Sequence, residues 1–371
     1  MVRKMLEKER IPLGGNETSG VWDEAIWRQM ADLGLLGVHI PEAYGGMGCT
    51  HVELGIVSEE LGRALCHVPY LSTIALAASA VESFGTEEQK QHFLPQIARG
   101  ETLISVGGLH QSHSFSSEPQ DQKKDSVLCK ESGSDYCLNG TITNLIDGDL
   151  AHSFIVIASE DRHASEPASK LLIVPRDAPG VTVKPTPSLD LTRGFAEVLL
   201  SDVIVPGERV MTAQNDSLSS SCQEMVRRLF DFGRTALCAE STGAANACLD
   251  MAVAYAKARH QFERPIGSFQ AIKHICADML LRVESARSAA NYASWVASHD
   301  LAKLNEAASL ATAYCVDAFF FCAAENIQIH GGIGFTWEHE AHHYFKRASV
   351  SQSILGTARS ARREYADSIG L

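Results

Sequence analysis

The spacing of apolar residues divides the chain into three stretches. From about residue 21 to residue 100 apolar positions recur every three or four residues, which predicts helices. Over residues 101–206 they form short runs separated by Pro, Gly, Asp and Ser, which predicts strands. Beyond residue 220 the helical spacing returns. The positions that carry the pattern are Ile26, Met30, Leu33 and Leu36, then the runs 154–158, 171–174, 181–183 and 196–200, then Met279, Val283, Ala286, Ala290 and Ala293.

This order predicts an α+β fold with an N-terminal helical domain over residues 1–100, a middle β domain over 101–220 and a C-terminal four-helix bundle over 221–371. A chain of 371 residues is too long for one simple core, so the parts must bury their faces against one another. The many small residues after Ser241 allow helices to approach closely, which suits a bundle that also packs against a second subunit. Residues 111–126 are polar and are expected to form a mobile surface loop.

Composition excludes several classes of partner. A net charge of −13 argues against nucleic acid, because a phosphate backbone would be repelled over most of the surface. Ten cysteines show no CxxC pairing and several lie in apolar runs, so we interpret them as reduced core thiols. The N-terminal residues lack the apolar segment of a signal peptide, and we find no stretch of about twenty uncharged apolar residues. We therefore expect no membrane association and a cytoplasmic location.

Two segments near helix ends carry candidate binding chemistry. Arg259, Gln261 and Phe262 combine a cation, an amide and a ring, which suit a pyrophosphate and an adenine. Taken alone, Arg259 fits an ordinary charged helix end better. The second segment, which follows Gln328, has three glycines within four positions, so its backbone can turn and approach a phosphate closely, although a helix C-cap has the same composition. Nearby histidines lack the carboxylate or cysteine spacing of a metal site, and we expect no metal. These histidines are His330, His339, His342 and His343.

Together these segments resemble one known family. They read RHQFERPIGSFQAIKH from Arg259 and ENIQIHGGIGFTWEHE from Glu325, and both are similar to the cofactor-binding half of acyl-CoA dehydrogenases. HIPEAYGGMG and FGTEEQKQHFLPQIARGE also resemble that family's N-terminal domain. The resemblance implies that the segments contact the FAD of a neighbouring subunit, so the chain assembles at least as a dimer. Glu263 departs from the family's usual glycine and is expected to point to solvent. The FAD contacts that the resemblance implies are Arg259, Gln261, Phe262, Phe269, Gln270, Gln328, Gly331 and Gly332.

The resemblance also implies a reaction, the FAD-dependent oxidation of an acyl-CoA to its 2,3-enoyl form, with electrons passed to an electron-transfer flavoprotein. That reaction needs a base to remove a proton next to the thioester carbonyl. The family's usual glutamate position, just before a Gly-Thr pair, is Leu355 in this chain. A second position used by some members directly precedes an arginine that matches Arg234, and it is occupied by Gly233. Neither residue can accept a proton. Arg234 is expected to shape the site near the thioester or the base.

Three explanations for the missing base stay open. Asp231 is a candidate base three residues before Arg234, although a solvated acid near a helix start is the more ordinary identity for it. Alternatively, the chain is a base-lacking subunit of a hetero-oligomer, as in some bacterial members of the family that act on steroid or other bulky CoA esters. Third, the fold serves as a catalytically silent scaffold or supports other flavin chemistry. The middle-domain segment LISVGGLHQSHSF lacks the family's usual flavin motif, which favours a contribution to a partner's cofactor site.

Overall fold

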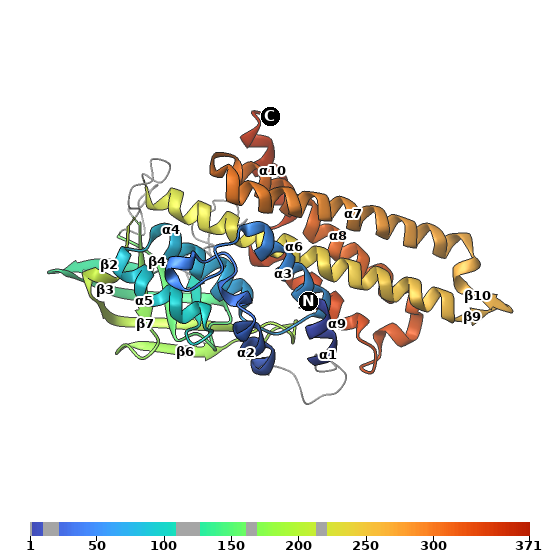
Figure 1. The fold of residues 1–371 in the computed structure, drawn as a ribbon, viewed down its shortest axis with the longest axis horizontal. Coiled ribbons are helices and arrows are strands. Elements are labelled where there is room, and N and C mark those ends of the chain that lie inside the picture. The colour runs from blue at the N-terminus through green and yellow to red at the C-terminus, as the bar shows by residue number, and fades with distance from the viewer. Residues whose placement is uncertain (1, 10–21, 109–126, 161–168, 213–220) are drawn as a thin grey trace.

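The computed structural model describes residues 2–9, 22–108, 127–160, 169–212 and 221–371, so the loop predicted over 111–126 lies outside the described residues. The N-terminal part is helical, as predicted (Figure 1). Thr50 and Thr86 begin two of its helices, and in each a capping box ties the threonine to the residue three positions on. The helices are α1 (Val2–Glu9), α2 (Glu24–Asp32), α3 (His51–Ala64), α4 (Ser79–Phe84) and α5 (Glu87–Ala98), with short helices η1 (Leu35–Gly37) and η2 (Glu42–Tyr44) and the π-helix η3 (Tyr70–Ala78).

The middle part is an eight-stranded sheet with the order β6-β7-β3-β2-β4-β5-β8, and β1 pairs with β4. The four apolar runs named from the sequence lie in β4, β5, β6 and β7. The long strand β3 has no such run, because most of its positions are only half-buried and many are polar. The strands are β1 (Ile104–Gly107), β2 (Val127–Ser132), β3 (Asp135–Ile146), β4 (Ser153–Ser159), β5 (Ser169–Pro175), β6 (Val181–Pro185), β7 (Phe195–Val205) and β8 (Val210–Met211), and η5 (Gly207–Arg209) precedes β8.

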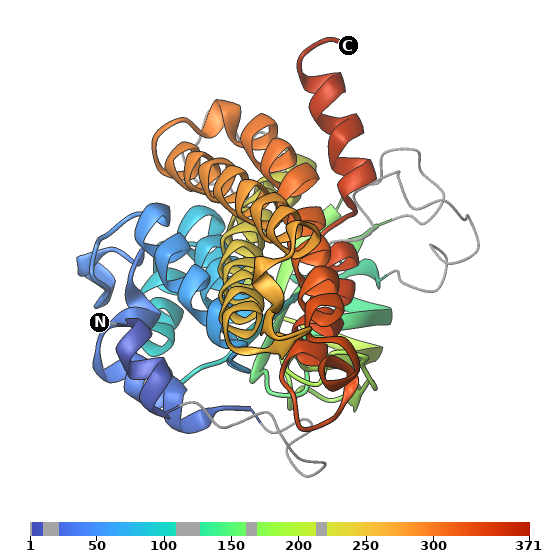
Figure 2. The same cartoon turned by 90° about the vertical axis from the view of Figure 1, so that its right-hand side faces the viewer.

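Long antiparallel helices form the C-terminal part. Helix α6 lies between the N-terminal helices and the pair α7 and α8 (Figure 2). Its close approach to α3 depends on Gly243, because an added Cβ there would lie 1.8 Å from the Glu59 carbonyl oxygen. The elements are α6 (Cys222–Ala258), β9 (His260–Gln261), β10 (Arg264–Pro265), η6 (Ile266–Ser268), α7 (Gln270–His299), η7 (Leu301–Lys303), α8 (Leu304–His330), η8 (Gly331–Phe335), α9 (Ala341–Ile354) and α10 (Ala358–Ser368).

Helix α8 corrects one sequence expectation. The helical stretch Leu301–Phe335 is apolar and long enough, by length and composition, to cross a membrane, although the sequence analysis named no such stretch. In the fold, 61% of its apolar window is buried, and α8 packs against α6, α7, α9 and α10. We therefore interpret α8 as a core helix whose apolar surface is covered by its neighbours. No disulfide joins any of the ten cysteines, all of which the structure describes, and six of them are buried.

Candidate functional site

The two positions where the family places a base meet in space. Gly233 lies on α6 and Leu355 directly follows α9, and a Cβ added to Gly233 would lie 2.9 Å from Leu355 Cδ1. The same Cβ would lie 2.5 Å from Leu76 Cδ2, so Leu76 from η3 is the third residue in this contact. Leu355 and Leu76 are each 1% exposed. This place is therefore dry, apolar and filled by leucine side chains, without a proton acceptor among them.

Arg234 lies next to this apolar contact and binds the backbone of Leu355. Its Nε donates to the Leu355 carbonyl oxygen at 3.0 Å, and its two Nη atoms donate to the two Glu364 carboxylate oxygens at 2.5 and 2.9 Å. The guanidinium carbon also lies 4.2 Å from the centre of the Phe230 ring. Arg234 is 1% exposed, and these hydrogen bonds tie α6 to Leu355 and to α10.

Asp231 is buried rather than solvated, so the interpretation of it as a solvated acid near a helix start is wrong. It is 1% exposed and accepts a hydrogen bond from Asn305 Nδ2 at 3.1 Å. Its Oδ1 lies 3.6 Å from Arg234 Nη1. Burial raises the pKa of Asp231 to about 6, although Arg234 and Asn305 both act to lower it. The long helix α6 continues past this point into the core, which is why an early helix acid loses its contact with water.

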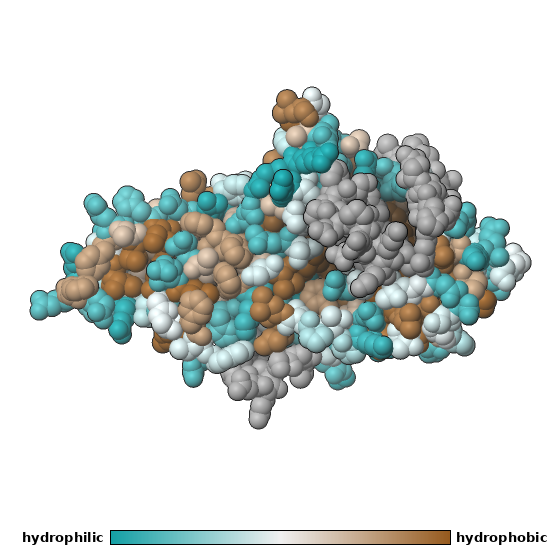
Figure 3. Space-filling view, turned by 180° about the vertical axis from the view of Figure 1, so that it is seen from behind, coloured by the Kyte–Doolittle hydropathy of each residue, from teal (hydrophilic) through white to brown (hydrophobic). Residues whose placement is uncertain are grey.

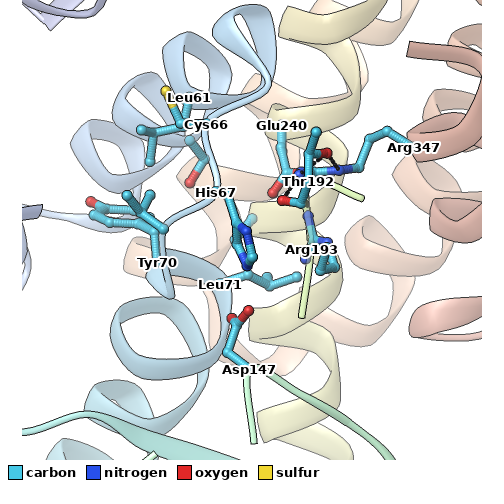
Figure 4. A pocket seen from close by; sticks show the side chains of 13 residues that line it. Leu61, Cys66, His67, Tyr70, Leu71, Asp147, Thr192, Arg193, Glu240 and Arg347 are labelled. Atoms are coloured by element: carbon cyan, nitrogen blue, oxygen red, sulfur yellow. Dashed lines mark hydrogen bonds and ion pairs between the residues drawn. The ribbon is translucent and has the colours of Figure 1, made fainter. Parts of the chain in front are cut away.

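Two partners in this cluster carried no sequence signal. Glu364 lies on α10, 130 residues from Arg234, and Asn305 lies on α8, 74 residues from Asp231. No local spacing links residues so far apart, and only the packing of α8 against α6, and of α10 against α8, brings them together. Glu240, which follows Asp231 on the same helix, faces another group: it accepts hydrogen bonds from Arg193 and Arg347 (Figure 4).

The residues from Arg259 to Gln270 form an exposed corner at the other end of α6. Strands β9 and β10 make a two-stranded turn, and Ile266 N donates to the Arg259 carbonyl oxygen at 2.8 Å. The Phe262 and Phe269 rings meet edge to face at 6.1 Å. Phe262 is nonetheless 85% exposed. Glu263 is also exposed and has a φ of 64°, which turns the chain at the tip.

The glycine segment lies at the same end of the helical domain, because α8 runs antiparallel to α7 and parallel to α6 (Figure 1). The Tyr255 and His330 rings stack at 4.3 Å, which joins the ends of α6 and α8. Gly331 has a φ of 62°, and an added Cβ at Gly331 or at Gly332 would meet no atom within 4 Å. Their backbone is therefore exposed to a ligand or a partner.

This corner has the donors that a dinucleotide needs. The side chains of Arg259, Gln261, Gln270 and Gln328 are exposed and bind no other side chain in the part of the chain that the structure describes. A guanidinium and three amides suit pyrophosphate and ring-edge acceptors. Apolar surface interrupts the polar surface of the molecule (Figure 3), and exposed Phe335 adds apolar surface beside the glycine segment. The predicted contacts thus fit FAD when a second chain covers them.

The four histidines at the end of α8 and after it pack against aromatic rings. His330 stacks between Tyr255 and His339, at ring distances of 4.3 Å to each. His342 and His343 lie 4.0 Å apart beside Trp337. Burial lowers the pKa of His342 to about 4, and the neighbouring His343 makes the second-largest contribution to this lowering. Over the described ranges, no three His, Cys, Asp or Glu residues converge as metal ligands would.

A cavity of about 340 Å³ lies between the sheet and α9, and the sequence analysis did not identify it. One wall comes from the segment before β7 and from the end of β3, and the other comes from α9. Ile354, the last residue of α9, lines the cavity and is followed directly by Leu355, which packs against Gly233. Apolar and polar residues line it in nearly equal number, and such mixed walls suit a flat heteroaromatic ring that also forms hydrogen bonds. The lining residues are Asn144, Thr186, Pro187, Ser188, Leu189, Phe195, Val350, Ser353 and Ile354.

The corner and Arg234 lie far apart along α6. Arg234 lies nearer the sheet, and Ala258 ends the helix beside the corner. The 24 residues between them correspond to about 36 Å of helix.

Comparison with known proteins agrees with this architecture. The family description "Acyl-CoA dehydrogenase, N-terminal domain" matches residues 1–101, and "Acyl-CoA dehydrogenase, C-terminal domain" matches residues 224–370. The chain is 32% identical to the probable acyl-CoA dehydrogenase YngJ of Bacillus subtilis (strain 168), over 98% of this chain and 94% of that protein.

Two solved structures have the same fold. The ChsE4-ChsE5 complex from Mycobacterium tuberculosis matches with a TM-score of 0.86 and 26% identity, over 99% of this chain and 94% of the matched one. A variant of the steroid acyl-CoA dehydrogenase Tcur3481-Tcur3483 matches with a TM-score of 0.84 and 26% identity, over 99% and 95% of the two chains. On the fold, both family matches and the similarity to YngJ, the chain belongs to the acyl-CoA dehydrogenase family, whose members oxidise acyl-CoA with FAD.

Proposed function

We propose that this chain takes part in the FAD-dependent oxidation of an acyl-CoA thioester to the 2,3-enoyl-CoA as one subunit of a hetero-oligomer. A homologous partner subunit supplies the base, and this chain contributes FAD contacts across the interface. The observation that carries the proposal is the contact of Gly233, Leu355 and Leu76, which leaves no carboxylate where the family's base acts.

The residues of this chain then have binding rather than proton-transfer roles. Arg259, Gln261 and Gln328 hold the pyrophosphate and adenine of a partner's cofactor, and Gly331 and Gly332 bring backbone amides close to it. When bound, FAD accepts hydride equivalents from the acyl group, and an electron-transfer flavoprotein takes up the electrons. Leu76 and Leu355 exclude water from the place beside the cavity.

The two-component relatives support a heteromeric assembly. Both solved structures reported above carry two protein names, ChsE4-ChsE5 and Tcur3481-Tcur3483, and the second is described as a steroid acyl-CoA dehydrogenase. We propose a fatty acyl or steroid side-chain acyl-CoA as the substrate class. The exposed corner agrees with this proposal, because it offers donors and apolar rings that the described part of its own chain leaves uncovered.

The assembly can be tested by colour. The chain is purified alone and after co-expression with a homologous partner from the same organism, and each preparation is titrated with acyl-CoA under anaerobic conditions. We expect the chain alone to show no bleaching of flavin absorbance, and the co-purified complex to be yellow and to bleach. Bleaching by the chain alone would contradict the proposal. A partner that bleaches at full rate without this chain would instead assign the chain a scaffold role.

A second candidate, an autonomous enzyme with Asp231 as base, rests on one observation. Asp231 lies two residues before Gly233 on α6, and burial raises its pKa to about 6, toward the range of a general base. Against it, Asp231 faces Asn305 and Arg234 in the helical core, whereas the cavity ends at Ile354.

The variant Asp231→Asn decides between the two candidates. We expect its kcat in the bleaching-competent assembly to stay within about twofold of the original, since general bases typically contribute about a hundredfold or more. The measurement is steady-state turnover with an artificial electron acceptor, with FAD content determined for each preparation. A loss of about a hundredfold at unchanged FAD content would establish Asp231 as the base and refute the partner-supplied base.

A further inference from the structure

The glycine segment lies in a loop, residues 331–338, whose two ends are joined by histidine rings. His330 is the last residue of α8, directly before the loop, and His339 directly follows it. Their ring centres lie 4.3 Å apart. His339 is held in turn by the start of α9, because its Nδ1 accepts a hydrogen bond from Ala341 N at 3.1 Å. The contact between the two rings therefore closes the loop at its base.

His330 also connects the loop to the helix that ends at the corner. Its ring stacks on the ring of Tyr255 on α6, with the centres 4.3 Å apart and the planes 30° from parallel. The Tyr255 carbonyl oxygen accepts a hydrogen bond from Arg259 N at 2.8 Å. Two contacts thus link the glycine segment, through His330 and Tyr255, to the backbone of Arg259.

The His330 ring is buried and fixed in orientation. The residue is 5% exposed, and its Nδ1 lies 2.8 Å from the Asn326 carbonyl oxygen. A carbonyl only accepts, so Nδ1 is the donor and carries the proton. Burial lowers the pKa of His330 from its ordinary value, and His339 acts in the same direction, although the hydrogen bond to Asn326 opposes them. At neutral pH the ring is therefore neutral, and it stacks on both neighbours without placing a charge in the core.

The loop needs such support because of its own composition. Glycine loses more conformational freedom than any other residue when it is fixed, and three of the first four residues of this loop are glycines. Gly331 has a φ of 62°, and a Cβ added at Gly331 or Gly332 would meet no atom of the described residues within 4 Å. Packing at these two positions does not hold the backbone. The rings at the base of the loop supply a fixed attachment instead.

We propose that His330 is a positioning residue that holds the glycine segment beside Arg259, so that both contact one dinucleotide in the partner subunit's site. The inference rests on the proposed function, because it takes as ligand the FAD of the partner subunit. His330 touches no ligand in this arrangement, since its ring lies between Tyr255 and His339. A loop that is ordered before FAD binds avoids the entropic cost of ordering it on binding, and this lowers the dissociation constant.

His299 offers a matched control at the end of α7. Its Nδ1 lies 2.8 Å from the Trp295 carbonyl oxygen, four residues earlier, in the same way that His330 bonds to Asn326. Its ring also stacks on an aromatic ring, that of Trp295, at 4.9 Å. His299 is exposed, however, and its stacking partner lies on its own helix. Replacing His299 therefore removes a helix-end histidine without loosening a contact between two helices.

The test measures the FAD affinity of the co-purified complex after its FAD is removed, by titration followed by flavin fluorescence. We expect His330→Leu to raise the dissociation constant about tenfold, the upper range for lost ring stacking. His330→Phe keeps a flat ring between its two neighbours, so its dissociation constant should stay within about twofold of the original. Tyr255→Leu removes the other ring and should act like His330→Leu, whereas His299→Leu should have no effect.

Hydrogen exchange of the isolated chain separates the order of the loop from general stability. In His330→Leu the amides of residues 331–338 should exchange faster, whereas those in the middle of α6 and α8 should keep their rates. His330→Phe should restore slow exchange in the loop.

A folded His330→Leu or Tyr255→Leu complex that binds FAD as tightly as the original would overturn the inference and leave the proposed function standing. So would a His330→Phe complex as weak as His330→Leu, because ring stacking would then not be what positions the loop. If the Arg259→Met complex binds FAD normally, or if the original complex binds none, the proposed function fails and the inference fails with it.

Discussion

Replacement of Arg234 by methionine is expected to lower the free energy of unfolding by about 3 to 5 kcal/mol. The variant leaves the Asp231 and Glu364 carboxylates buried without their common cation, and it removes the donor to the Leu355 carbonyl oxygen. Methionine fills similar volume, so the loss comes from charge and hydrogen bonding rather than from a cavity. Urea unfolding of the purified chain, followed by circular dichroism, measures the change.

The control for this experiment is Arg362→Met, which removes a more exposed ion pair from the same helix-to-helix region. Exposed pairs contribute under about 1 kcal/mol, because water screens them in both states. A loss for Arg234→Met no larger than that of the control would contradict the structure's assignment of Arg234 as the centre of a buried cluster. Adding Asp231→Asn to Arg234→Met should recover part of the loss, since one unpaired charge is then absent.

Replacement of Arg259 by methionine is expected to weaken FAD binding by the hetero-oligomer by about 10- to 100-fold, the scale of charge-assisted hydrogen bonds to a phosphate. Folding should be unaffected, because the Arg259 side chain is exposed and binds no other side chain within the described ranges. Equilibrium titration of the FAD-stripped complex, followed by flavin fluorescence, measures the affinity.

Lys257→Met provides the matched control two residues earlier, on an exposed position of the same helix end. Equal losses from the two variants would show a general electrostatic attraction rather than a contact specific to Arg259. No loss from Arg259→Met would contradict the corner as a cofactor site. Under the proposed assembly, in which the corner completes a site in the partner, the same variant should change FAD content only in the complex and leave unfolding of the isolated chain unchanged.

The fold could be predicted from the sequence to a useful level. The helical spacing before residue 100 and after residue 220, with the apolar runs between, correctly indicated helix, sheet and helix. Four of the eight strands in the main sheet were not identified, and β3 shows why. Its positions are mostly half-buried, so neither alternation nor a continuous apolar run marks it, and its place in the sheet depends on pairing with β7 and β2.

The candidate site could likewise be predicted only in part from the sequence. Glycines after a helix end and a cation beside an amide and a ring are local patterns, so the corner could be named in advance, although its role as a FAD site stays a prediction. The burial of Asp231 could not be predicted, because it depends on α8 and α10, which are distant along the chain. The cavity beside α9 likewise had no sequence signal, since its two walls come from segments far apart in the sequence.

By itself the sequence determined the order of helical and strand-forming stretches, the family resemblance, and the absence of a carboxylate at Leu355 and Gly233. These are properties of single positions and of short-range periodicity. Only the tertiary structure decided that Gly233 and Leu355 touch, that Arg234 binds Glu364, and that Arg347 joins α9 to the segment before β7. Such contacts arise from the packing of distant elements. Only when those elements pack together are the charges removed from water, and only then does each buried charge need a partner.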